Sequence, residues 1–198
     1  HHAQSADWVA LAGSLPQGVP AGWYTDLIKE IRNVAPQARI AVDTSDAPMK
    51  AIAEQLDSAA PDLIKPNGFE LGQLTNQDGL ALERAAAAGD YSAVVGAARD
   101  VVRRGIKEVL VTLGGSGAVL VTANGAWAAT PPPATVKSTV GAGDAALAGY
   151  LLGCTQGRGP AESLALSVAY GTAAAAKPGT QFPRPEELDT AHTSISVL

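Results

Sequence analysis

Apolar residues in the first half of the chain alternate between short continuous runs and helical spacing. The runs WVALA (Trp8–Ala12) and RIAVD (Arg39–Asp43) have the length of buried strands. A turn-rich loop, GSLPQGVP, follows the first run, and apolar residues then recur every three or four positions between Trp23 and Val34. This order of strand, loop and helix predicts an α/β fold built on parallel strands.

The second half keeps this alternation up to Thr112 and then changes. The segments VLVT (109–112) and AVLVT (118–122) predict strands separated by a glycine turn, and Asn124-Gly125 is a strong hairpin signal. We therefore expect antiparallel pieces after Thr112 in a mainly parallel sheet covered by helices, with residues 1–198 in a single domain. A very short strand is predicted over 62–65. Helices are predicted over 48–56, with Ser45 near its start as an N-cap type, and over 92–104, within 138–153 and over 160–176; residues 70–74 are predicted as the beginning of another helix.

Composition limits the classes of protein to consider. The chain has 198 residues, 46% of them hydrophobic, which is enough to fill the core of one sizeable α/β domain. The net charge is −5 and no window concentrates Lys and Arg, so we expect no nucleic-acid partner. No apolar run reaches the ~20 residues that span a bilayer, so no membrane partner is expected. The single cysteine, Cys154, excludes an intramolecular disulfide and favours a reducing, cytoplasmic location.

The stretch STVGAGDAALAGYLLG places an acid at the start of a predicted helix. Gly141, Ala142 and Gly143 precede Asp144, and the two glycines would let a phosphate approach the free amides of the helix N-terminus. An acid beside a bound phosphate makes sense if it takes a proton from an alcohol that attacks phosphorus held over those amides. The alternative is an ordinary aspartate of the first helical turn, favoured by the helix dipole.

A second candidate stretch is LIKPNGFE, which contains Lys65, Asn67 and Glu70. An amide and a carboxylate three residues apart at the start of a helix can face one cleft and hold water around Mg²⁺. A turn followed by a solvated helix start explains the same residues without a metal.

The third stretch, VTLGGSGAVL, ends one strand and begins another. Thr112, Gly114, Gly115 and Gly117 would make a backbone surface that a flat base or a phosphate can approach closely, although a simple β-turn has the same pattern. The stretch lacks the third glycine of G-x-G-x-x-G, and KST at 137–139 has no glycine before the lysine. A dinucleotide-binding oxidoreductase domain and a Walker A loop are therefore disfavoured.

Taken in order, GSLPQG, VDTS, KPNGFE, VTLGGSGA and STVGAGDA resemble the ribokinase-like sugar kinases of the PfkB family, most of all its 1-phosphofructokinase and tagatose-6-phosphate kinase branch. The resemblance runs from about residue 10 to residue 180. It implies a three-layer αβα fold, with the early strands and the lid of such kinases missing from this chain. One departure is Asp46, where this branch usually has glycine after DTS, and it concerns the local turn only.

The resemblance also implies roles for individual residues. Asp144 would be the catalytic base and would meet the sugar, and the amides of Gly141, Ala142, Gly143 and Asp144 would form an anion hole. The remaining implied assignments are Lys65, Asn67, Thr112, Gly114 and Gly117 for ATP, Asn67 and Glu70 for Mg²⁺, Ser14 for the sugar phosphate, and the carbonyls of Ser138 and Val140 with the loop 175–181 for a monovalent cation such as K⁺.

The reaction that these assignments favour is ATP-dependent phosphorylation of a sugar phosphate, with fructose 1-phosphate going to fructose 1,6-bisphosphate. Tagatose 6-phosphate or fructose 6-phosphate kinase is the nearest alternative, and a non-catalytic nucleotide-binding module is an alternative of another class. Because the first sheet strand would have an unpaired edge, we also expect self-association, such as a homodimer.

Overall fold

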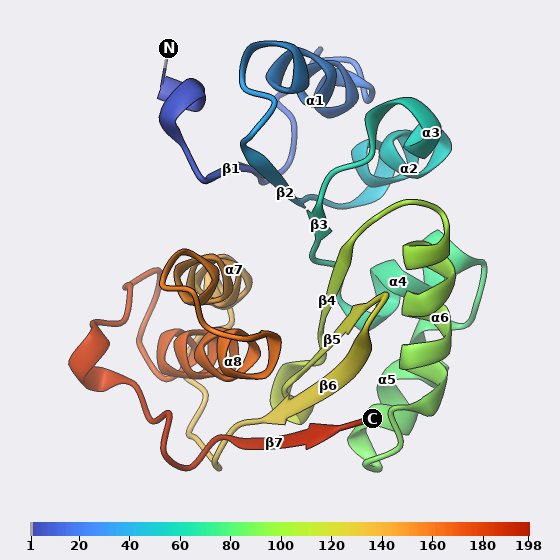
Figure 1. Cartoon of the computed structure of the whole chain (residues 1–198). Coiled ribbons are helices and arrows are strands. Elements are labelled where there is room, and N and C mark those ends of the chain that lie inside the picture. Colours follow the sequence, from blue (N-terminus) through green and yellow to red (C-terminus); the bar gives the residue numbers. More distant parts are fainter. Residues whose placement is uncertain (1) are drawn as a thin grey trace.

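The computed structural model describes residues 2–198, which form a seven-stranded sheet with the strands in sequence order from β1 to β7 (Figure 1). Neighbouring strands from β1 to β4 are parallel, and those from β4 to β7 are antiparallel. The parallel strands before Thr112 and the antiparallel hairpins after it confirm the predicted mixture. The strands are β1 (Trp8–Ala12), β2 (Arg39–Asp43), β3 (Leu63–Ile64), β4 (Glu108–Thr112), β5 (Ala118–Thr122), β6 (Gly125–Thr130) and β7 (Ser194–Val197).

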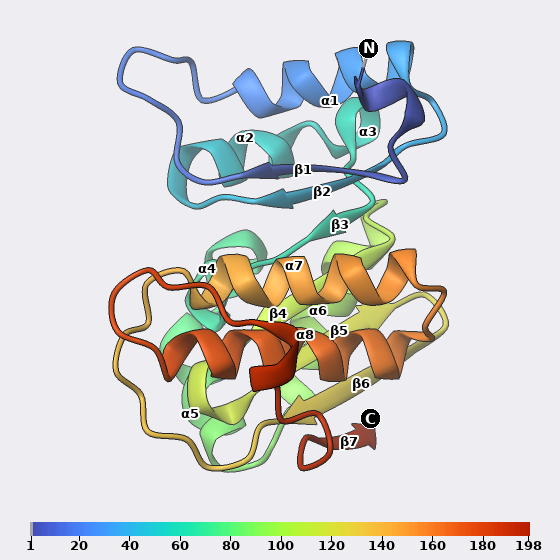
Figure 2. The same cartoon turned by 90° about the vertical axis from the view of Figure 1, so that its left-hand side faces the viewer.

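Helices cover both faces of this sheet and make three layers (Figures 1 and 2). The helices up to α6 pack on one face, and α7 and α8 pack on the other. The helices are α1 (Trp23–Val34), α2 (Asp46–Glu54), α3 (Leu56–Ala59), α4 (Gly68–Thr75), α5 (Gly79–Ala87), α6 (Ser92–Arg103), α7 (Ala142–Thr155) and α8 (Pro160–Ala175), with short 3-10 turns η1 (His2–Ser5), η2 (Gly114–Ser116) and η3 (Pro185–Glu187). Within residues 2–198, none of these helices has the length and apolar character needed to cross a membrane.

The alternation of side chains along each strand explains the two cores. In β2, Ile40 and Val42 point into the larger core beneath α1 to α6, whereas Ala41 points into the smaller core beneath α7 and α8. All three are fully buried. The central strands are therefore apolar on both faces, which is why they read as continuous runs in the sequence.

Most predicted elements are confirmed, and the differences have local causes. The predicted helix over 48–56 begins earlier, at Asp46, and ends at Glu54, because Gln55 leaves helical geometry and Leu56 starts the separate helix α3. Ser45 is the N-cap residue as expected, but its hydroxyl donates to Asp46 Oδ2 (3.1 Å) and does not cap the helix. Asp46 itself has a φ of 54°, the left-handed conformation that glycine adopts most easily.

The helix α5 and the strand β7 were also not predicted from the sequence. Helix α5 is short and alanine-rich, with Leu82 and Ala86 as its only buried apolar side chains, and β7 is exposed along its whole length.

Close packing fixes α7 against α8. A Cβ on Gly149 would lie 2.8 Å from the carbonyl oxygen of Leu166, and one on Gly153 would lie 2.8 Å from the Cα of Ser163. Only glycine allows this approach at these two positions. The Ser167 hydroxyl, which is fully buried, donates to the Ala146 carbonyl (2.8 Å) and ties the two helices together. The position of the α7 N-terminus is thereby set by the packing of the whole helix pair.

Candidate active site

The carboxyl ends of the parallel strands bring two predicted residues and one further acid to one edge of the sheet. The predicted residues are Lys65, which follows β3 directly, and Thr112, which ends β4; the further acid is Asp43, which ends β2. Asn67 forms an isolated parallel bridge with Thr112, and the Thr112 amide donates to the Pro66 carbonyl (3.0 Å). This edge is where ligands bind in open α/β sheets.

The N-terminus of α7 faces the same region with free backbone donors. Gly141 is its N-cap residue and has a φ of 78°, a left-handed conformation. The Ala142 and Ala145 amides donate to the carbonyls of Thr139 and Gly141, but the amides of Gly143 and Asp144 have no backbone acceptor among the described residues. Since a helix N-terminus carries about half a positive charge, these two amides can bind an anion.

A buried lysine adds a full positive charge next to these amides. Lys65 is only 5% exposed, and a Cβ placed on Gly143 would lie 3.2 Å from its Nζ atom. The ammonium also forms an ion pair with Asp43, whose Oδ2 atom is 3.0 Å from Nζ. Burial raises the pKa of Asp43, Lys65 offsets part of this effect, and the charge on Asp144 raises the pKa further. Asp43, Lys65 and Asp144 therefore form one electrostatically connected group.

A cavity of about 550 Å³ extends from this end of α7 along α8. Its walls come from the turn between β4 and β5, the loop after β6 and small residues of α7 and α8. The predicted residues that line it are Thr112, Gly114, Gly115, Gly117, Ala142 and Gly143, together with Ala175 of the loop predicted for a monovalent cation. The lining residues that were not predicted are Ala118, Pro131, Pro132, Pro133, Ala134, Val136, Thr139, Ala146, Ser167, Val168, Gly171 and Thr172. Its volume lies in the range of small-molecule sites.

Gly117 determines how the turn closes onto β6. It has a φ of 89°, and a Cβ at this position would lie 1.9 Å from the carbonyl oxygen of Ala129. No other residue fits such an approach without moving the backbone. Gly117 therefore has a structural reason to be glycine, and Gly114, Gly115 and Gly117 together leave this part of the cavity wall free of side chains.

The Asn67 and Glu70 side chains cap the start of α4. Asn67 Oδ1 accepts from the Glu70 amide (2.7 Å), and Glu70 Oε2 accepts from the Asn67 amide (2.8 Å). This capping box leaves Oε1 of Glu70 without a hydrogen-bond donor among the described residues. Burial raises the pKa of Glu70, the bond from Asn67 and the charge on Lys65 oppose it, and Asp43 and Asp46 raise it further. A carboxylate oxygen in acidic surroundings fits a Mg²⁺ ion held partly through water.

Two other predicted residues, Asp144 and Ser14, lie at the surface around this group. Asp144 is exposed on the first turn of α7 and does not line the cavity. Ser14 is exposed beyond β1, in a loop anchored by the Gly13 amide, which donates to the Asp43 carbonyl (2.8 Å). The Ser138 amide donates to the Ala175 carbonyl (3.2 Å), so the loop before α7 lies beside the end of α8.

Val140 is 62% exposed on the loop before α7, and its amide donates to the Ser138 hydroxyl (3.3 Å).

Asp43 is a residue of this group that was not predicted. The VDTS segment was part of the family resemblance, but no role was assigned to its acid. An acid at the end of an apolar strand is the feature of the sequence that could have indicated it.

Comparison with known proteins assigns the chain to a family. Residues 2–187 match the model of the pfkB family of carbohydrate kinases. The chain belongs to this family. It is 39% identical over 195 residues to a 1-phosphofructokinase of Rhodobacter capsulatus, covering 98% of the chain and 57% of that relative. It is 34% identical over 163 residues to the 1-phosphofructokinase of Escherichia coli strain K12, covering 82% of the chain and 47% of that relative.

Solved structures agree with this assignment. Phosphofructokinase-2 from Escherichia coli, in complex with substrates and products, superposes with a TM-score of 0.74 at 30% identity, over 91% of the chain and 54% of that protein. A ribokinase from Thermotoga maritima, at 19% identity and a TM-score of 0.67 over 94% of the chain and 56% of that protein, shows that the pfkB chain has the ribokinase-like fold. The chain spans about half the length of the curated relatives it matches.

Proposed function

We propose that this pfkB-family chain contributes the nucleotide site and the catalytic acid–base group of an ATP-dependent sugar-phosphate kinase. The observation that carries the proposal is the end of α7, where two free amides and the buried ammonium of Lys65 adjoin a 550 Å³ cavity, with Asp144 beside them. Phosphoryl transfer to an alcohol requires positive charge near the phosphates, space for the nucleoside and a carboxylate next to the attacking hydroxyl.

In this reaction the protein positions the phosphates and accepts one proton. The sugar hydroxyl oxygen bonds to the γ-phosphorus, the bond from that phosphorus to the bridging oxygen breaks, ADP leaves, and the hydroxyl proton passes to Asp144. The amides of Gly143 and Asp144 and the Lys65 ammonium stabilise the charge that develops on the phosphoryl oxygens. A Mg²⁺ ion bound near Asn67 and Glu70 would supply further neutralisation of the phosphates.

The proposed acceptor is fructose 1-phosphate, because the matched relatives named above are 1-phosphofructokinases. Fructose 6-phosphate is the second candidate, since a structural relative is phosphofructokinase-2 in complex with fructose 6-phosphate. We also propose a monovalent-cation site at the carbonyls of Ser138 and Val140, supported by the phosphofructokinase-2 structure in complex with potassium. The lone cysteine supports a cytoplasmic location.

The nucleotide site is tested by calorimetry of the 198-residue chain with Mg-ATP. We expect weak but measurable binding at millimolar ATP, because the cavity, Lys65 and the α7 N-terminus all lie within this chain. Absence of heat from protein that is folded by circular dichroism would contradict the proposal.

A second test uses Gly143→Ala, which separates binding from stability. Alanine is favoured over glycine inside a helix by ~0.8–1 kcal/mol, so the melting temperature should hold or rise. The new Cβ would press on Lys65 Nζ, 3.2 Å away, and displace the ammonium that meets the phosphates. Since a charge-assisted hydrogen bond contributes ~1.5–3 kcal/mol, the affinity for Mg-ATP should fall about tenfold or more.

We further propose that the isolated chain self-associates through β1. This strand pairs only with β2 among the described residues, so one edge presents free amides and carbonyls. Phosphofructokinase-2 of Escherichia coli has a tetrameric form, which supports association in the family. Sedimentation velocity should show a concentration-dependent dimer, and a single monomeric species at high concentration would rule out this use of the edge.

A further inference from the structure

One tyrosine hydroxyl connects the two walls of the nucleotide cavity. Tyr91 is the N-cap residue of α6, and its hydroxyl donates to the Ser116 carbonyl (3.0 Å) in the turn that carries Gly114 and Gly117. The same oxygen lies 3.4 Å from Thr130 Oγ1. Thr130 ends β6 and directly precedes Pro131, where the second wall of the cavity begins.

The direction of these two bonds follows from the chemistry of the groups. A phenol has one proton, and the Ser116 carbonyl can only accept, so Tyr91 donates to Ser116. The Thr130 hydroxyl then donates to the tyrosine oxygen. Both bonds meet at a single half-buried oxygen atom, which links the glycine turn on one side to the loop after β6 on the other.

The end of the glycine turn is held where Gly117 packs against the Ala129 carbonyl and Ala118 pairs with Ala129, but its tip has few other restraints. Inside the turn, the Ser116 and Gly117 amides donate to Leu113 and Gly114, which are residues of the same turn. Gly114 and Gly115 have no atom within 4 Å of where a Cβ would stand, so the tip of the turn is open on that side. The hydroxyl of Tyr91 is therefore an additional contact from outside that holds the tip of the turn at Ser116.

We propose that Tyr91 and Thr130 are positioning residues that set the separation of the two cavity walls and thereby the affinity for the nucleoside part of ATP. Neither side chain lines the cavity, so both act through the Ser116 carbonyl and the segment that begins at Pro131. This inference rests on the proposed function, because it requires that the cavity holds ATP.

The test compares Mg-ATP dissociation constants of single variants and their combination, measured by calorimetry on the same 198-residue chain. Tyr91→Phe keeps the ring and removes the hydroxyl, and Thr130→Val keeps the shape and removes the donor. Each should weaken Mg-ATP binding about 3- to 10-fold, the range expected for loss of one hydrogen bond. The double variant should be no weaker than Tyr91→Phe alone, because both substitutions remove the same link.

Two further variants separate positioning from general stability. Thr130→Ser retains the hydroxyl and should restore wild-type affinity. Tyr150→Phe is the matched control: it removes a tyrosine hydroxyl that donates to Glu108 Oε2 (3.0 Å) at the amino end of β4, away from the cavity, and should leave the Mg-ATP affinity unchanged. Melting temperatures measured on the same samples show whether any variant loses affinity through unfolding.

Each outcome decides the matter. Wild-type affinity in Tyr91→Phe, additive losses in the double variant, or an equal loss in Tyr150→Phe would overturn the positioning role while leaving the proposed kinase function intact. Failure of the folded wild-type chain to bind Mg-ATP would overturn the proposed function, and the positioning role with it.

Discussion

Replacing Asp144 with asparagine is expected to lower the turnover number of the proposed sugar-phosphate kinase reaction about 10²–10⁴-fold. Asparagine keeps the shape of the side chain at the first turn of α7 but cannot accept the proton of the attacking hydroxyl. The Gly143 and Asp144 amides and Lys65 remain, so the Michaelis constant for ATP should change little. Steady-state kinetics with fructose 1-phosphate and with fructose 6-phosphate measure both constants.

The competing explanation of Asp144 is an acid that only complements the helix dipole. That interaction contributes ~0.3–1 kcal/mol, so its loss would lower the melting temperature slightly and leave turnover nearly intact. Asp26 is the matched control, because it is an exposed acid in the first turn of α1, outside the candidate site. Asp26→Asn should have the same small thermal effect with full activity. Near-normal turnover in Asp144→Asn would exclude the role of Asp144 as the base.

The sequence predicted the parts of the site that depend on local pattern. The glycines and the acid at 141–144 stand next to each other in the chain, so their position at a helix N-terminus follows from the pattern itself. The N-x-x-E spacing of Asn67 and Glu70 also has a local reason, since these residues form a capping box. The same two residues can cap α4 and face a metal, so the local pattern alone does not separate the two roles.

The contacts that could not be predicted join distant segments. The ion pair between Asp43 and Lys65 requires β2 and β3 to be parallel neighbours, and single-sequence periodicity does not give strand order. The cavity walls from Pro131 and from Gly171 meet only because α7 and α8 pack on the sheet near the glycine turn. The pattern of the sequence thus located the helix N-terminus with its free amides, whereas the cavity depends on tertiary packing.

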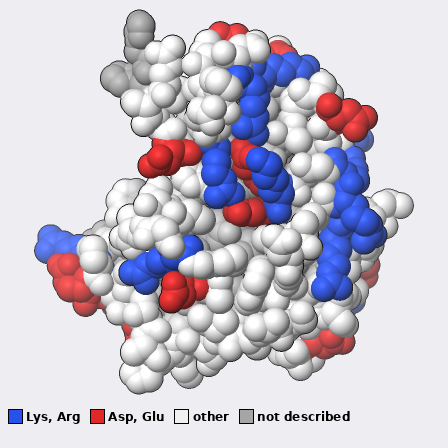
Figure 3. Space-filling model, in the orientation of Figure 1, with Lys and Arg blue, Asp and Glu red and all other residues white. Residues whose placement is uncertain are grey.

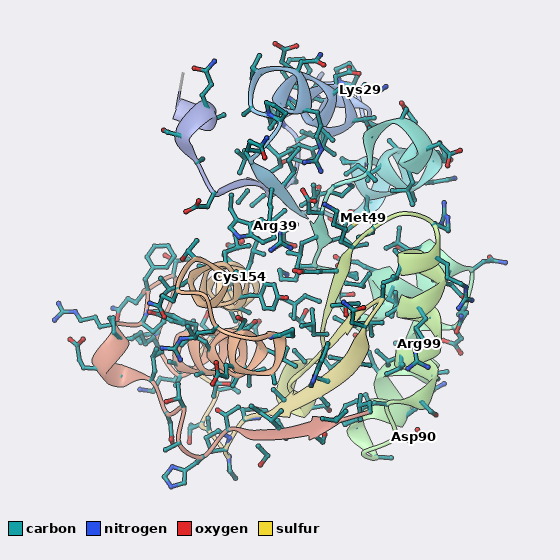
Figure 4. All side chains as sticks on the ribbon, viewed as in Figure 1. Lys29, Arg39, Met49, Asp90, Arg99 and Cys154 are labelled. Atoms are coloured by element: carbon teal, nitrogen blue, oxygen red, sulfur yellow. The ribbon has the colours of Figure 1, made fainter. Side chains whose placement is uncertain are left out.

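A second set of charged side chains lies at the amino ends of strands β1 to β4, opposite the candidate site. Basic and acidic side chains lie side by side there in Figure 3, and Arg39, labelled in Figure 4, is among them. Arg39 stacks over Trp8 at 4.0 Å and pairs with Glu108 (2.6 Å). Asp62, directly before β3, is only 1% exposed. It accepts from Arg32 Nη2 (2.7 Å) and from the Ile40 amide (2.8 Å), and it pairs with Lys107 Nζ (2.7 Å).

Replacing Asp62 with alanine is expected to reduce the free energy of unfolding by about 1–3 kcal/mol at neutral pH, the range for leaving a buried donor without its acceptor. Its partners Arg32 and Lys107 are 34% and 71% exposed, so water can solvate their charges once the carboxylate is gone. The Ile40 amide would lose its acceptor in a fully buried position. Asp100→Ala is the matched control, because Asp100 pairs with Arg103 on the surface and such pairs contribute ~0–1 kcal/mol. Urea unfolding of both variants at neutral pH measures the difference.

The loss of unfolding free energy in Asp62→Ala should also become smaller as the pH falls. Burial alone would raise the pKa of Asp62, but the hydrogen bonds from Lys107, the Ile40 amide and Arg32 outweigh it and hold the pKa below its usual range. The carboxylate therefore stabilises the fold above the unfolded pKa of about 3.9, and this contribution disappears as the pH falls through the folded pKa. The difference in the free energy of unfolding between wild type and Asp62→Ala should therefore decrease below about pH 4. A difference that stays constant with pH, or one no larger than that of Asp100→Ala, would show that Asp62 contributes through packing and not through its charge.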